Sequence, residues 1–269
     1  MYGNSIYFSF VALTFLSCEA KRLIRVVYKK KSTFETIDHE NMLKNVQFSK
    51  PIGIVGGAGP MASIFLCQTI IEICQKEYGC NDYSDFPEII LESYPFIRGD
   101  REKIRHDIAL CFSKLQKAGA KLFSIASNSF HGFLPDTTSV AFVNLVLESV
   151  GEASRLQVSK ALILAAQPTI DLKLYELTGL QCIYPSKEDQ QLIQKIIREV
   201  AGGMITKDQA QQLKGIINTL QEKSQIDGII IACTELPLIH RQFPIAETGL
   251  PVVDTVEVLA RRLLVLAQE

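Results

Sequence analysis

The sequence predicts an α/β protein built from two similar halves, and three observations support this fold class. From residue 51 onward, short apolar runs alternate with longer amphipathic patterns, which is typical of parallel α/β sheets. The apolar runs repeat at similar distances, since 70 residues separate positions 52 and 122 and 68 separate positions 161 and 229. The runs ending at 126 and 232 also finish alike, in Ala followed by a small nucleophilic residue. Chance similarity between two buried strands is the alternative.

Each element follows from its local pattern. Ile52–Val55 reads as a buried strand, the turn at 56–60 follows it, and a helix over 61–76 begins after Pro60, which suits a first helical turn. Further strands are expected at 88–92, 122–126, 161–165, 229–232 and 251–253. Further helices are expected near 100–118, 137–156, 186–201, 206–224 and 255–267.

Composition excludes several classes of protein. The 269 residues are 47% hydrophobic and 21% charged, as in an ordinary soluble globular protein rather than a disordered or multi-span membrane chain. The net charge of −1 gives no reason to expect nucleic acid as a partner. The seven cysteines lack paired metal-ligand spacing, so we expect no metal site and reduced thiols in a cytoplasmic protein.

The N-terminal segment 1–46 differs from the remainder. Residues 1–31 carry six basic residues and one acid, a charge of +5, so the other 238 residues sum to −6. The apolar run 6–16 before the basic cluster is short for a bilayer span and has no basic residue ahead of it, unlike a secretory signal. Two interpretations stay open: membrane contact through 1–31, or a non-native extension ahead of Met42.

The strand ends predict where a ligand binds. In open α/β sheets, ligands lie beyond the carboxyl ends of the strands, so two facing halves would place Ser127 and Cys233 on opposite walls of one cleft. The loop Gly57–Gly59 matches G-x-G-x-x-A, but the acidic residue expected about 20 positions later is missing, which argues against a dinucleotide. The loop is either a helix N-terminus suited to a carboxylate or a plain tight turn.

Four segments resemble the aspartate/glutamate racemase family. Ile52–Pro60 (IGIVGGAGP) looks like its opening motif, and Gly228–Pro237 (GIIIACTELP) closely resembles its second signature. Ile125–His131 (IASNSFH) is similar to the first signature, usually Cys-Asn-Thr-x-His, and Val252–Thr255 (VVDT) to the segment that returns the chain to the first domain. The resemblance covers roughly 50–269, in the family's order and spacing.

The resemblance implies two pseudo-symmetric three-layer α/β domains with mainly parallel sheets and the active site in the cleft between them. The first domain would comprise 47–147 plus 249–269, and the second 148–248. It also implies racemisation without a cofactor, in which one thiolate removes the α-proton and an opposite thiol delivers another. The partner would be an amino acid or dicarboxylate, and the assembly a homodimer. Substrate-binding residues would be Gly57, Ala58, Gly59, Asn128, Ser129, Thr169, Thr234 and Glu235.

Three departures from the family pattern affect this expectation. Ser127 stands at the first cysteine position, leaving Cys233 as the surviving thiol, and an alcohol is much less acidic than a thiol. His131 is not a departure, because the family also has histidine there, and it either supports Ser127 or is a structural histidine. The loop at 165–169 keeps Thr169 but has Ala and Pro where the family has Thr and Gly. The residue that would hold a side-chain carboxylate is not settled between Arg98 and Arg101, which lie near the expected segment.

The first functional hypothesis is therefore an isomerase: a PLP-independent racemase of aspartate or glutamate, slow or biased in direction because of Ser127. The second is a decarboxylase of the same superfamily, in which Cys233 alone protonates a carbanion. The third is a catalytically degenerate paralogue that binds an amino acid.

Overall fold

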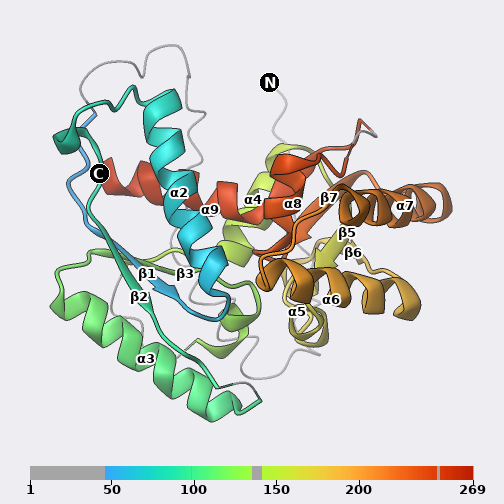
Figure 1. The fold of residues 1–269 in the computed structure, drawn as a ribbon, viewed down its shortest axis with the longest axis horizontal. Coiled ribbons are helices and arrows are strands. Elements are labelled where there is room, and N and C mark those ends of the chain that lie inside the picture. Colours follow the sequence, from blue (N-terminus) through green and yellow to red (C-terminus); the bar gives the residue numbers. More distant parts are fainter. Residues whose placement is uncertain (1–45, 98, 135–140, 247–248, 269) are drawn as a thin grey trace, which may run out of the picture. The chain divides into compact units, whose positions relative to one another are not determined.

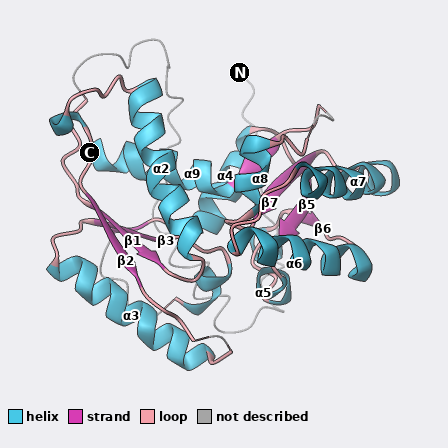
Figure 2. Cartoon of the chain, in the orientation of Figure 1, coloured by secondary structure: helices cyan, strands magenta, loops and turns pink. Residues whose placement is uncertain are grey.

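The computed structural model describes residues 46–97, 99–134, 141–246 and 249–268. Residues 42–269 form one compact unit, which contains both predicted halves. Within it, the described strands form two parallel sheets of four strands each, with helices packed on them (Figures 1 and 2). The predicted α/β class with parallel sheets is confirmed.

The two sheets have equivalent strand orders. The first sheet runs β2-β1-β3-β4 and the second β6-β5-β7-β8. The strands are β1 (Ile52–Gly56), β2 (Ile89–Ser93), β3 (Leu122–Ile125), β4 (Ala141–Phe142), β5 (Lys160–Ala165), β6 (Gln181–Ile183), β7 (Gly228–Ala232) and β8 (Val252–Asp254). β3 and β7 therefore occupy the same place in their sheets, as the repeat between 122–126 and 229–232 predicts.

Most predicted helices are present, at slightly different bounds. The α-helices are α2 (Pro60–Glu77), α3 (Arg101–Lys117), α4 (Leu145–Arg155), α5 (Gln167–Asp171), α6 (Lys187–Ala201), α7 (Lys207–Ser224), α8 (Leu236–Gln242) and α9 (Thr255–Gln268). The helix expected over 137–156 begins only at Leu145, because the Asn144 side chain accepts hydrogen bonds from the first turn and β4 precedes it. The short elements β6, α5 and α8 were not predicted.

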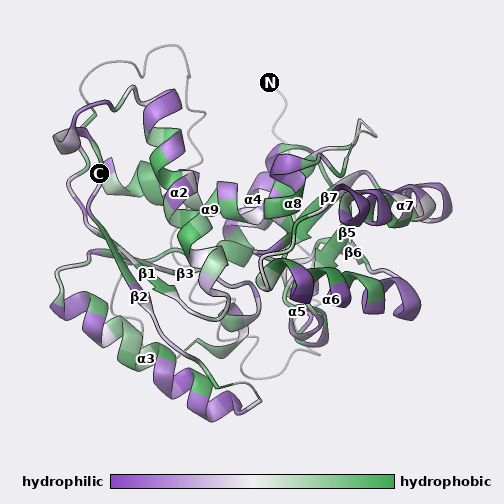
Figure 3. Cartoon of the chain, viewed as in Figure 1, coloured by the Kyte–Doolittle hydropathy of each residue, from purple (hydrophilic) through white to green (hydrophobic). Residues whose placement is uncertain are grey.

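Alternating residues of each sheet enter different hydrophobic clusters. In β5, Leu162 and Leu164 pack with residues of α6, α7 and α8, whereas Ile163 enters a cluster built with α2, α4 and α9. In the first sheet, Val55 joins the α3 cluster, whereas Ile54 enters that same α2–α4–α9 cluster. Hydrophobic residues accordingly fill the strands, while α3, α6 and α7 each show one polar face (Figure 3). The α2–α4–α9 cluster thus contains residues of both sheets.

The chain segment 249–269 serves both halves. We expected it to return to the first domain, but Val252 and Val253 pair with Ile229 and Ile230, so β8 completes the second sheet. α9 contacts both α2 and α4. The predicted division into domains stays a proposal.

The predicted extension 1–46 lies outside the described residues, apart from residue 46, and so does any membrane contact of 1–31. In the described part of the chain, no helix is both long and apolar enough to cross a bilayer.

Candidate functional site

Ser127 and Cys233 occupy equivalent positions, each directly beyond the carboxyl end of the third strand of its sheet. Ala126 donates a backbone hydrogen bond to Val55 at the end of β1, and Ser127 follows it. Ala232 pairs with Ala165 at the end of β5, and Cys233 follows it. Both side chains are buried. The sheet topology therefore positions both residues at ligand-binding strand ends.

The thiol of Cys233 is bound to a carboxylate of its own signature. Its Sγ donates a hydrogen bond of 3.1 Å to Oε2 of Glu235, and Thr234 Oγ1 donates to the same oxygen at 3.3 Å. Burial raises the pKa of Cys233 well above its ordinary value, and the negative charge of Glu235 raises it further. In this conformation Cys233 is a neutral thiol with a proton acceptor beside it.

The glycine loop meets this same carboxylate. A Cβ at Gly59 would collide with Oε1 of Glu235, so a larger residue there would displace this carboxylate. Gly57 has a φ of 99°, and a Cβ there would collide with the backbone of Tyr94. Gly59 is the N-cap of α2, where the helix dipole favours negative charge. The place predicted for a substrate carboxylate thus lies against Glu235.

Three buried side chains connect the segment after β3 to the second half. Tyr175 donates from its hydroxyl to Asn128 Oδ1 at 2.6 Å, and Asn128 Nδ2 donates to Thr255 Oγ1 at 3.3 Å. Thr255 Oγ1 in turn donates to the carbonyl of Ile231, two residues before Cys233, at 2.9 Å. This network fixes the residue next to Ser127 relative to β7.

His131 is a structural histidine. Leu145 donates its backbone N–H to His131 Nε2 at 3.1 Å, so Nδ1 carries the proton and donates to the carbonyl oxygen of Ser127 at 2.8 Å. Complete burial lowers the pKa of His131 to about 4. The Ser127 hydroxyl instead lies 3.4 Å from that of Ser129. Of the two interpretations of His131, the structure supports the structural one.

The remaining predicted residues differ in their burial and in whether the structure describes them. Thr169 is buried at the start of α5, and its hydroxyl has no hydrogen-bond partner among the described residues. Arg101 is exposed, with its guanidinium 5.9 Å from the Phe133 ring centroid. Arg98 lies outside the described residues. The substrate-carboxylate contact sought at Arg98 or Arg101 therefore stays unassigned.

A second polar region lies where α2 meets α8 and α9. A cavity of about 270 Å³ there is lined by Asp254, and burial raises the pKa of that carboxyl to about 6. Arg241 pairs with Glu72 at this boundary, and Arg261 Nη2 donates to Glu77 at 2.7 Å. These ion pairs tie α2 to the helices beyond β7 and β8.

The equivalent parallel sheets, with Ser127 and Cys233 at corresponding strand ends, are the arrangement that the resemblance to the amino-acid racemase class implies. Comparison with known sequences agrees, because residues 55–263 match the family model described as Asp/Glu/Hydantoin racemase. The chain belongs to this family, and the resemblance and the isomerase assignment predicted from its motifs are confirmed.

Individual relatives support the same assignment. The chain is 25% identical over 224 residues to the broad specificity amino-acid racemase RacX of Bacillus subtilis, covering 78% of this chain and 95% of that one. A crystal structure of an aspartate racemase homologue from Pyrococcus horikoshii is 27% identical, with a TM-score of 0.68, over 82% of this chain and all of the other. The Picrophilus torridus aspartate racemase, at 22% identity, shares the fold with a TM-score of 0.66, over 81% and 94% of the two chains.

Two residues of the polar network were not predicted as site residues. Tyr175 belongs to none of the motifs, and its contact with Asn128 joins residues that are 47 positions apart in the chain. Thr255 belongs to the Val252–Thr255 motif. The sequence therefore indicated that this segment matters, but it did not indicate the hydrogen bonds of Thr255.

Proposed function

We propose that this chain is a PLP-independent racemase of a small acidic amino acid, with aspartate or glutamate as substrate and Cys233 as its acid/base. The observation that carries this proposal is the partly buried hydrogen bond from Cys233 to Glu235, beside the N-terminus of α2. A carboxylate next to a thiol provides an acceptor for the thiol proton, and the helix N-terminus provides donors for a substrate carboxylate.

In the proposed reaction, Glu235 accepts the proton of Cys233, and the thiolate removes the α-proton of one enantiomer. A proton then reaches the opposite face of the carbanion from the Ser127 hydroxyl or from a water that it orients. Solvent reprotonates Ser127 and takes up the proton that Glu235 had accepted, which returns the site to its starting state. Because a hydroxyl is a weaker acid than a thiol, the two directions are unequal in rate. Asn128, Ser129 and Thr169 would hold the substrate carboxylates, together with Thr234 and the loop 57–59.

Deuterium incorporation at Cα in D₂O tests this proposal with both enantiomers of aspartate and glutamate. The wild-type protein should incorporate deuterium, faster from one enantiomer, and Cys233→Ala should reduce the rate by about 100-fold or more. Cys67→Ala, which removes a half-buried thiol of α2, is the matched control and should exchange like the wild type. Equal exchange by Cys233→Ala and the wild type would contradict the proposal.

One observation also favours a second candidate. Because Cys233 is held as a neutral thiol, it is suited to donating a proton to a carbanion formed by loss of CO₂. CO₂ release from substituted malonates, without α-proton exchange in amino acids, would support this decarboxylase. Binding of an amino acid without either reaction would indicate the degenerate paralogue.

Homodimeric assembly, cytoplasmic location and freedom from cofactors belong to the same proposal. The thiols described by the structure are all unpaired, as expected in a reducing compartment. Light scattering on the full chain tests the dimer.

A further inference from the structure

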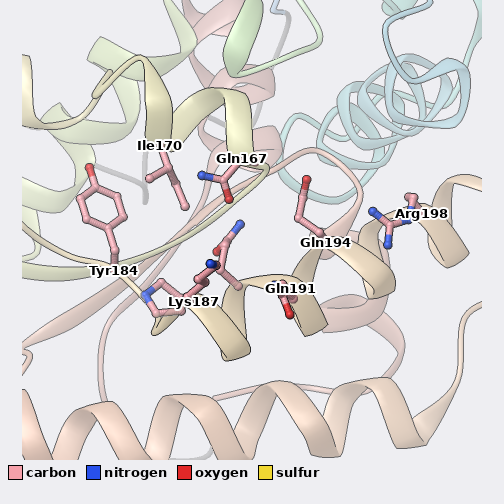
Figure 4. Close-up of a pocket in the computed structure, with 9 residues that line it drawn as sticks. Gln167, Ile170, Tyr184, Lys187, Gln191, Gln194 and Arg198 are labelled. Carbon is pink, nitrogen blue, oxygen red and sulfur yellow. The ribbon is translucent and has the colours of Figure 1, made fainter.

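A second cavity, of about 570 Å³, lies between α5, the end of β6 and one face of α6 (Figure 4). Residues 187, 190, 191, 194 and 198 of α6 line it, and their spacing of one, three or four residues places them on one side of the helix. Neither Ser127 nor Cys233 lines this cavity. It is therefore distinct from the site proposed for racemisation.

The charges that face this cavity are positive. Its lining includes Lys187 and Arg198 and no Asp or Glu. Neither cation forms an ion pair with another residue that the structure describes. The two lie toward opposite ends of the group of lining side chains (Figure 4). Such a lining attracts an anion.

One buried glutamine oxygen lacks a hydrogen-bond donor, and a second, partly exposed one is free to accept a hydrogen bond. Gln190 is 7% exposed, and its Nε2 donates to the carbonyl of Ala165 at 3.0 Å, while its buried Oε1 has no partner among the described residues. Gln167 donates from Nε2 to Asp171 at 2.8 Å, which leaves its own Oε1 as an acceptor. A ligand that matches this cavity must carry donors as well as negative charge.

We propose that this cavity binds a small hydroxylated anion, with either a phosphate or a carboxylate supplying the charge. Lys187 and Arg198 supply positive charge at the two ends of the cavity, one of them binds the anionic group, and Gln167 and Gln190 accept hydrogen bonds from the hydroxyls. Gln167 lies two residues before Thr169, so an occupied cavity also fixes the segment that carries Thr169.

Isothermal titration calorimetry on the full chain tests this directly, independently of racemase activity. Ribose 5-phosphate and gluconate are the probes, and their comparison distinguishes a phosphate from a carboxylate source. Inorganic phosphate lacks the hydroxyls of a carbon chain, and ribose lacks charge. Each should bind at least about tenfold more weakly than the better probe.

The variant Lys187→Ala/Arg198→Ala should weaken binding by about tenfold or more. Lys195→Ala removes a charge from the same helix, at a residue paired with Glu199 and absent from the cavity lining, and should bind like the wild type. Circular dichroism confirms that each variant is folded. The proposal is overturned if neither probe binds the wild type, if inorganic phosphate binds equally well, or if the double variant binds unchanged.

Discussion

The thiol of Cys233 points to the carboxylate of Glu235, two residues ahead in the same signature, across 3.1 Å. Both groups are held at the N-terminus of α2 through the close approach of Glu235 to Gly59. One carboxylate therefore contacts an element of each half and sets the protonation of the thiol.

Glu235→Gln should lower the pKa of Cys233, because it removes a negative charge that disfavours the thiolate. It should also slow α-proton exchange by about 100-fold, since an amide does not accept the thiol proton. The ultraviolet absorbance of the thiolate, followed against pH with Cys233→Ala as the blank, measures the first effect. An unchanged titration would show that the two groups are not coupled.

Ser127→Cys should raise the racemisation rate by about tenfold or more and reduce its bias between enantiomers, because a thiol replaces a weak acid. Ser129→Cys, which places a thiol two residues away, is the matched control and should not do so. Polarimetry from each pure enantiomer gives both rates. A loss of activity in Ser127→Cys would argue for a role of the hydroxyl that a thiol does not supply.

Thr169→Val should leave the stability of the fold unchanged or raise it slightly, because the buried hydroxyl has no partner to lose. If that hydroxyl binds a substrate carboxylate, KM should rise by about tenfold. Thr169→Ser keeps the hydroxyl and should retain the wild-type KM. A wild-type KM in Thr169→Val would remove this residue from the binding site.

Tyr175→Phe should lower the free energy of unfolding by about 1–3 kcal/mol, because Asn128 Oδ1 would be left buried without its donor. Urea denaturation measures this change. Tyr83→Phe is the control, since Tyr83 is 99% exposed and its hydroxyl should contribute little. Equal stability of the two variants would mean that the network beside Ser127 contributes nothing to the free energy of unfolding.

The stability of the fold should decrease in acid because of His131. Its pKa is about 4 in the folded protein against 6.5 when unperturbed, so the unfolded chain binds the proton more readily. The stabilisation is complete above about pH 6.5 and is lost as the pH falls towards about 4, by about 3 kcal/mol in total. NMR titration should show a neutral His131 ring at about pH 6, and a charged ring there would contradict the assignment.

Sequence predicted the fold well where a strand was long and wholly apolar. β5 and β7 are buried at almost every position, and their runs are bounded by turn residues. β6 has three residues with no apolar alternation, and α5 and α8 are too short to show a helical period, so none of them was predicted. The helix expected at 137–156 was overextended because propensity does not show that residues 141–142 pair with β3.

The candidate site was predictable where it follows strand ends, as at Ser127 and Cys233. Contacts between segments that are distant in the chain could not be predicted. The approach of Glu235 to Gly59 joins residues far apart in the chain, and the hydrogen bond from Tyr175 to Asn128 depends on tertiary packing. Periodicity carries no information about such pairs.

The hydrophobic cluster of α2, α4 and α9 has a consequence for attempts to divide this protein. It takes residues from both sheets, including Ile54 of the first and Ile163 of the second. A fragment containing either sheet alone would present that apolar face to water and would tend to aggregate. The two halves resemble each other in topology, yet each depends on the other for its solubility.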